Sequence, residues 1–180
     1  MKKTICLTLC ALLVLTALCA CGKKLDPASP SGVVAASLDA VKSGSSTEDS
    51  MFENAKSLAG DDDAMYNALF GSIAYTVKDE RIEGDVAEVD LDVTTVDISA
   101  ALGAYLTEAS AHAGDEDWDA DGSYFVSMIS KKDAAKKVFA VTAHLEKQED
   151  TWVLTKDGNA ALLNAVTGGL YDYENTQLGD

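Results

Sequence analysis

The chain has no cysteine after residue 21, although it is 180 residues long. Its four cysteines are Cys6, Cys10, Cys19 and Cys21, and the first three fall in an apolar N-terminal run. A segment without cysteines forms neither disulfides nor thiolate zinc sites. The stability of everything that follows Cys21 must therefore come from the packing of side chains.

Positive charge is also scarce. Lys and Arg together number 14, against 30 Asp and Glu, which gives a formal net charge of −16. Removal of the first 20 residues would take away Lys2 and Lys3, so the remainder would carry 12 − 30 = −18. A surface this acidic repels nucleic acids and anionic lipid headgroups. We therefore predict that nucleic acid is not a partner.

The motifs of common catalytic sites are absent as well. The chain contains no G-x-S-x-G, no glycine-rich phosphate-binding loop and no H-E-x-x-H. Glu88, Asp90 and Asp92 could form a catalytic set of carboxylates. However, their spacing of two residues puts all three on one face of a strand, where exposure to solvent explains them. We predict that the protein is not an enzyme and uses no cofactor.

The apolar segment at the N-terminus is short for a membrane-spanning helix. It runs from Ile5 to Ala20, whereas a spanning helix needs about 20 apolar residues. Lys2 and Lys3 precede it, and a small residue, Ala20, ends it. A basic start, an apolar middle and a small-residue end are typical of an export signal.

The end of this segment, Leu18-Cys19-Ala20-Cys21, resembles a bacterial lipobox, in which Leu, a small residue and Ala or Gly precede an obligatory cysteine. The resemblance implies a signal peptide over residues 1–20, cleavage before Cys21 and a lipid thioether on its sulfur. Two acyl chains on one residue give stable anchoring, where one chain binds only marginally. The protein would then lie at the outer face of the bacterial cytoplasmic membrane. The alternative is an ordinary secretory signal that leaves Cys21 as a free thiol.

The residues after Ala20 predict a tether followed by one domain. Residues 21–32 hold both prolines of the chain together with Ser and Gly, which is typical of an exposed, flexible tether. The hydrophobic periodicity then predicts this order: helices over 33–42, 46–60 and 61–71, a hairpin over 72–95, helices over 98–112 and 123–132, a hairpin over 135–156, and a helix over 159–166. Residues 171–180 read as a loose tail.

Alternation along the predicted strands indicates which side chains face the core. The inward set is Ala87, Val89, Leu91 and Val93 in the first hairpin and Phe139, Val141, Ala143 and Leu145 in the second. The helix over 98–112 is expected to turn one stripe inward: Ile98, Ala101, Tyr105 and Ala109. Separate hairpins and helices favour an α+β fold. We predict a curved antiparallel sheet of two hairpins, packed against the N-terminal and central helices.

Four stretches of the chain are similar to a known group of proteins: "LDAVKSG", "VAEVDLDVTTVDISAALGAYL", "KKVFAVTAHLEKQEDTWVL" and "NAALLNAVTGGL". Together with the lipobox they resemble small Gram-positive lipoproteins that carry a domain of unknown function of the nuclear transport factor 2-like, or cystatin-like, superfamily. The resemblance implies that residues 33–170 form a cystatin-like cone, whose sheet curves around helices and often leaves a cavity at the open end. It implies no particular ligand.

One acidic loop has the spacing of a calcium site. Asp117, Asp119 and Asp121 fit the first half of an EF-hand loop, D-x-D-x-D-G. Position 12 of that loop should be Glu, but the chain has Met128 there, so a complete EF-hand is not expected. Two interpretations stay open, a weak calcium loop and a solvated acidic loop between two helices.

His144 is the remaining candidate for a ligand contact. It alternates with Thr142 and Glu146, which places it on the face of the sheet opposite Phe139 and Leu145. If that face lines a pocket, His144 would touch the ligand. The other histidine lies on a different element, and no third ligand at metal spacing accompanies either, so no metal site is predicted.

These observations predict a membrane-anchored, extracytoplasmic lipoprotein that binds an unidentified small molecule or envelope protein and has no enzymatic activity. The alternative is a structural or accessory protein of the cell envelope without a ligand pocket.

Overall fold

The computed structural model describes residues 25–45, 50–60, 62–115 and 122–170. Cys21, the acidic loop with Asp117, Asp119 and Asp121, and residues 171–180 lie outside the described residues. In chain order the elements are α1 (Pro30–Ser43), α2 (Ser50–Ala59), α3 (Asp63–Phe70), β1 (Ala74–Glu83), β2 (Val86–Val96), α4 (Ile98–Ala111), α5 (Gly122–Ile129), β3 (Lys136–Gln148), β4 (Thr151–Leu154) and α6 (Lys156–Val166). Within these described ranges, no helix combines the length and the apolar character that crossing a bilayer requires.

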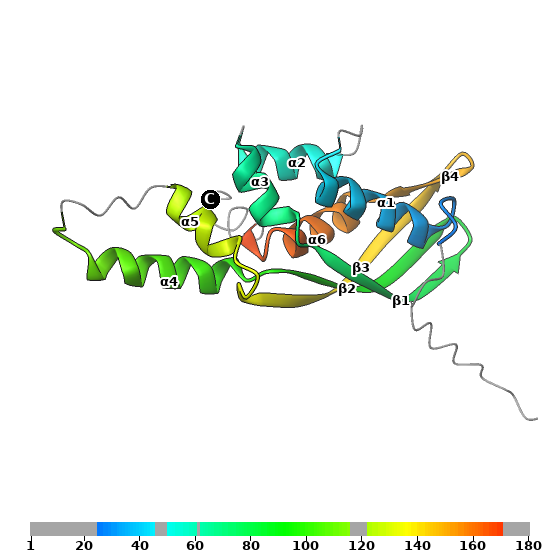
Figure 1. Ribbon diagram of the computed structural model, residues 1–180. Helices are drawn as coiled ribbons and strands as arrows, with labels where there is room; N and C mark the ends of the chain where they lie inside the picture. The colour runs from blue at the N-terminus through cyan, green and yellow to red at the C-terminus, as the bar shows by residue number, and fades with distance from the viewer. Residues whose placement is uncertain (1–24, 46–49, 61, 116–121, 171–180) are drawn as a thin grey trace, which may run out of the picture.

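The four strands form one antiparallel sheet in the order β1-β2-β3-β4. β2 and β3 pair without interruption, from Val86 opposite Glu146 to Val96 opposite Lys136. The two predicted hairpins and the α+β class are therefore confirmed. Bulges are the usual means of bending long strands, and the β2–β3 pairing has none, so the sheet is not strongly curled (Figure 1). The cone that the family resemblance implied is not confirmed.

Helices cover one face of this sheet, and among the described residues no helix covers the other face, which we call the open face. Figure 1 shows α1, α2, α3 and α6 on the covered side. The predicted inward residues form the centre of the core: Ala87, Val89, Leu91, Val93, Ala143 and Leu145 are buried, and Phe139 and Val141 are half-buried against them. The side chains that alternate with these on β2 and β3 are half-buried or exposed on the open face. The predicted orientation of both hairpins is confirmed.

α1 begins three residues earlier than its periodicity predicted. Ser29 is the N-cap, and its hydroxyl accepts a hydrogen bond of 3.0 Å from the backbone N–H of Gly32. Pro30 occupies the first helical position, where its missing N–H costs nothing. Residues 30–32, which composition assigned to the tether, therefore form the buried first turn of α1. A Ser-Pro pair before an apolar run is a start signal for a helix that composition alone hides.

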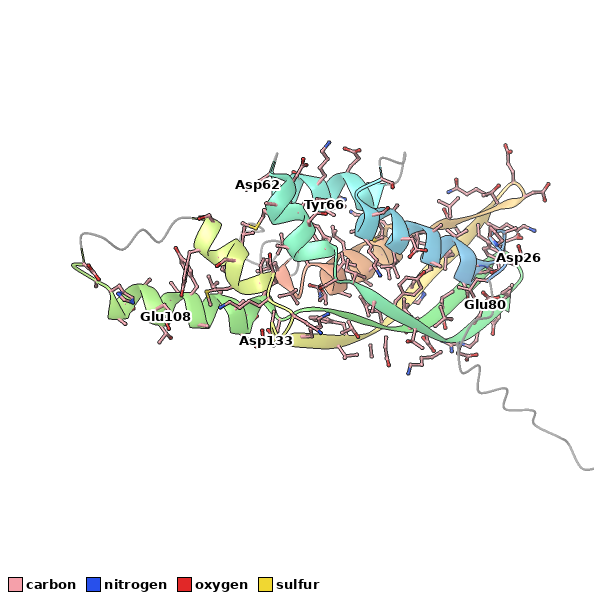
Figure 2. All side chains as sticks on the ribbon, viewed as in Figure 1. Asp26, Asp62, Tyr66, Glu80, Glu108 and Asp133 are labelled. Atoms are coloured by element: carbon pink, nitrogen blue, oxygen red, sulfur yellow. The ribbon has the colours of Figure 1, made fainter. Side chains whose placement is uncertain are left out.

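The first turn of α1 is tied to the sheet. The backbone N–H of Ser31 donates a 2.8 Å hydrogen bond to the carboxylate of Glu80 in β1. A carboxylate is favoured at this place because the N-terminus of a helix is electropositive. Figure 2 labels Glu80 and Asp26 at this end of the molecule, where the described chain begins.

α4 does not lie over the main core. It extends past the end of the sheet (Figure 1), and Ile98 is its one buried residue. Ala101, Tyr105 and Ala109 are half-buried, and the Tyr105 ring lies 5.8 Å from the Phe125 ring of α5. The expected stripe exists, but it packs on α5 rather than on the sheet, because α4 starts where the pairing of β2 with β3 has ended.

A second, smaller apolar cluster forms at this end of the molecule. Its buried members are Ala68, Val96, Ile98 and Ile129, and partly buried residues packed against it include Phe125, Val126 and Leu170. α5 ends at Ile129, whereas the sequence pattern extended this helix to residue 132. Lys131 and Lys132 therefore leave the helix and belong to its connection with β3.

We predict that Leu91→Ala lowers the free energy of unfolding by about 2–5 kcal/mol, because Leu91 is fully buried at the centre of the sheet and its loss leaves a cavity. Val138→Ala is the matched control, since Val138 is 59% exposed on the same sheet, and a change within about 0.5 kcal/mol is expected there. Urea unfolding measures both. Equal losses in the two variants would contradict the assignment of the covered face.

Candidate functional site

The open face of the sheet carries a network of paired charges around Arg81. A register shift in β1 between Val77 and Asp79 places Asp79 opposite Asp90 of β2, and Arg81 opposite Glu88. The guanidinium of Arg81 contacts all three carboxylates, at 3.0 Å from Asp79, 2.6 Å from Asp90 and 2.9 Å from Glu88. The bulge thus turns one arginine toward three acids on two strands.

Hydrogen bonds hold the carboxylate of Asp90 in its ionised form. Its pKa lies below the ordinary value of 3.8, chiefly because Arg81 donates to it and also because the Thr142 hydroxyl donates at 2.7 Å. The contacts of Arg81 with the three carboxylates raise the pKa of its guanidinium above the ordinary value, and the hydrogen bond to Asp90 contributes most. A carboxylate whose pKa is lowered is a poor proton donor near neutral pH.

His144 lies on this open face, where its alternation placed it. Its Nδ1 is 3.6 Å from the Glu88 carboxylate, and its side chain is 49% exposed. A hollow of about 120 Å³ on β1 and β2 is lined by Arg81, Glu83, Val86, Ala87 and Glu88. His144 is not among its lining residues. That volume admits a few water molecules. The ligand contact of His144 stays a prediction.

A groove of about 620 Å³ lies at the other end of β2. It lies between α3, the end of β2, α5 and the connection from α5 to β3. In Figure 2 the labelled Asp62 marks the start of α3 and Asp133 marks that connection. Ligand sites usually enclose about 300–1,000 Å³, so the groove has room for a small molecule. We refer to it as the α3–α5 groove.

The walls of the α3–α5 groove are held by backbone hydrogen bonds. Asp62 caps α3 by accepting from the N–H of Ala64 at 2.8 Å. In the connection after α5, the N–H of Ala134 donates to the carbonyl of Lys131 at 3.0 Å, and that of Asp97 donates to the carbonyl of Ala135 at 2.8 Å. The lysines of this connection are therefore carried on a backbone that is anchored to the end of β2.

The groove has an apolar floor and a positive rim. The lining residues with apolar or small side chains are Ala64, Ala68, Gly71, Val96, Val126, Ile129 and Ala134. Lys131, Lys132 and Lys136 supply the charge, and they are exposed. In the part of the chain that the structure describes, none of these three lysines forms an ion pair.

One polar group of the lining lacks a hydrogen-bond partner. The hydroxyl oxygen of Ser72, in the turn that follows α3, is buried and makes no hydrogen bond within the described residues. A buried hydroxyl without a partner costs about 1–3 kcal/mol.

A third hollow, of about 360 Å³, lies between β3 and α6. Its lining has no charged residue: Phe139, Ala140, Val141, Thr142, Ala160, Ala161, Asn164 and Ala165. It lacks the convergent charge of the α3–α5 groove, which we take as the candidate functional site. Among the described residues, no group of three or more His, Cys, Asp or Glu is placed to hold a metal ion.

Sequence reasoning missed the lysine rim, although the signal was present. The stretch Lys131-Lys132-Asp133-Ala134-Ala135-Lys136-Lys137 holds four of the 14 basic residues of the chain. In so acidic a protein this concentration of positive charge is unusual. Hydrophobic periodicity assigns these residues to the end of one helix and the start of one strand, and it takes no account of their charge.

No protein-family model matches the chain, and no curated protein matches it. Among solved structures, part of the chain is distantly similar to YcdA of Bacillus subtilis subsp. subtilis strain 168, which is described as a "putative lipoprotein". The two proteins are 18% identical, and the TM-score is 0.38. The match covers 73% of this chain and 43% of YcdA, so the chain spans less than half the length of that protein.

We predict that Asp90→Asn lowers the free energy of unfolding near neutral pH by up to about 1 kcal/mol, the range of exposed ion pairs. Because the pKa of Asp90 is lower in the folded protein than in the unfolded chain, its ionised form stabilises the fold above about pH 4. This contribution disappears as the pH falls through the folded pKa.

Urea unfolding of both proteins across this pH range measures the difference. It should be present at pH 7 and should shrink as the pH falls below about 4. Asp150→Asn, in the turn between β3 and β4, removes the same charge away from Arg81 and should show no such dependence. A difference that is independent of pH would contradict the account of Asp90.

Proposed function

We propose that the protein is a lipoprotein at the outer face of the bacterial cytoplasmic membrane, anchored through Cys21, and that it is a non-enzymatic binding module. The observation that carries the proposal is the α3–α5 groove, which combines a ligand-sized volume, an apolar floor and three lysines. The alternative is a structural or accessory envelope protein without a ligand pocket. The groove favours the binding module.

The position of the anchor supports the use of the groove. The described chain starts at the α1 end of the molecule, whereas the α3–α5 groove lies at the α5 end (Figure 1). Cys21 is four residues before Leu25, so at full extension the two lie no more than roughly 14 Å apart. β2, which runs from one end to the other, has 11 residues and spans roughly 35 Å. A groove at the far end would face away from the membrane and stay open to the exterior.

The charges of the open sheet face support a non-enzymatic role. Glu88 and Asp90 have the spacing of a carboxylate pair, but both are paired with Arg81. A general acid or base works best when its pKa is near the working pH, and the pKa of Asp90 is shifted away from it.

The proposal also includes a place in the nuclear transport factor 2-like superfamily. The order of helices and hairpins along the chain supports this part of it.

The anchor is tested by the mass of the mature chain purified from membranes. We expect a chain that begins at Cys21 and carries the added mass of a lipid thioether. Cys21→Ser should remove all of this added mass, whereas Cys19→Ser, two residues earlier in the predicted signal peptide, should leave it unchanged. A mature wild-type chain with a free thiol at Cys21 would favour the ordinary secretory signal instead.

The binding role is tested by native mass spectrometry of the full chain purified from its own envelope. We expect a retained small molecule in the wild type. Ala64→Phe should abolish its retention, because Ala64 is an exposed residue of α3 that lines the groove, and a ring there would fill the space. A wild-type chain that consistently carries no ligand would favour the structural alternative.

A further inference from the structure

Three of the 14 basic residues of the chain line the α3–α5 groove. The chain as a whole carries 16 more negative than positive charges. Lys131, Lys132 and Lys136 nevertheless converge on one groove, with Asp133 as the single acidic residue between them. A cleft with charge of one sign and low-dielectric walls concentrates ions of the opposite sign. The ligand is therefore expected to be an anion, although the surface as a whole repels anions.

The floor of the groove indicates that the ligand is more than a simple anion. Ala64, Val126 and Ala134 line the groove and are exposed or half-buried, next to the buried Val96 and Ile129 of the second apolar cluster. A free inorganic anion would leave this apolar surface in contact with water. An apolar group attached to the anion would cover it, and each buried methylene raises affinity roughly fourfold.

The number and type of the rim groups favour a phosphate monoester as the headgroup. A phosphate monoester carries about −1.5 to −2 charges near neutral pH and has three strong acceptor oxygens. Three ammonium groups match these oxygens, since each lysine acts as a point charge with three donors.

From this complementarity we infer that the α3–α5 groove binds a soluble anionic amphiphile, a molecule in which a phosphate monoester is joined to a short apolar chain. This inference rests on the proposed binding function and adds the chemical class of the ligand. The headgroup lies at Lys131, Lys132 and Lys136, and the apolar chain lies along the floor between α3 and α5. The proposed occupant is soluble and is not a headgroup of the anchoring membrane, because the described chain starts at the α1 end of the molecule and the groove lies at the α5 end.

Calorimetric titration of the full chain in phosphatidylcholine nanodiscs tests this class, with empty nanodiscs as the blank. The probes are hexyl phosphate, inorganic phosphate, hexanol and hexyltrimethylammonium. We expect hexyl phosphate to bind at least about tenfold more tightly than inorganic phosphate or hexanol, and hexyltrimethylammonium not to bind. Equal affinity for hexyl phosphate and inorganic phosphate, or binding of the cationic probe, would overturn the inference.

Variants locate the binding on the groove. The triple change Lys131→Gln, Lys132→Gln and Lys136→Gln should weaken hexyl phosphate binding at least about tenfold. The matched control Lys42→Gln, Lys56→Gln and Lys156→Gln removes the same charge from exposed lysines on α1, α2 and α6 and should change affinity less than about twofold. Equal effects of the two triple changes would overturn the inference.

Two further variants separate the remaining outcomes. Ala64→Phe should reduce the affinity for hexyl phosphate to that for inorganic phosphate, and an unchanged affinity would overturn the inference. Binding that occurs only after removal of residues 171–180, which contain Asp172, Glu174 and Asp180, would assign the groove to the chain's own acidic terminus and also overturn it. If hexyl phosphate does not bind but native mass spectrometry finds a retained neutral ligand, the proposed binding function stands and the inferred ligand class is wrong.

Discussion

The pairing of β2 with β3 is the constraint on which the rest of the structure depends. It is the longest uninterrupted pairing among the described strands, and its buried face, with Val89, Leu91 and Ala143 at the centre, receives the helices. Since no disulfide is available after Cys21, burial of this face supplies the stability. The pairing also sets the two ends of the molecule, with the start of the described chain at one and the α3–α5 groove at the other.

The groove exists because the helix-covered face of the sheet ends where β2 and β3 stop pairing, and α4 and α5 lie beyond that point. At Val96 the strand pairing stops, and α4 continues outward, while α5 packs against α4, α3 and Val96 at the end of β2. The second apolar cluster is therefore thin, and one side of it opens between α3 and α5. The connection back to β3 crosses this opening and carries the lysines. The apolar surface between α3 and α5 is thus not covered by another element of the described chain, and lysines form its rim.

The strands and their faces could be predicted from the sequence, because alternation along Ala87–Val93 and Phe139–Leu145 depends only on which side is buried. The start of α1 and the end of α5 could not be obtained in this way: the first is set by a cap and a proline, and the second by the turn at Lys131. The direction of α4 depends on where the neighbouring strands end, which periodicity does not encode. The groove combines side chains from three separate segments of the chain, so only its lysines could have been recognised in advance.

The account as a whole is tested most directly by amide chemical shifts of the full chain in phosphatidylcholine nanodiscs, recorded with and without hexyl phosphate. The account predicts changes confined to the residues around the α3–α5 groove, in 64–72, 96–97 and 126–136. Changes centred instead on Arg81, Glu88 and His144, on the open face of the sheet, would contradict it.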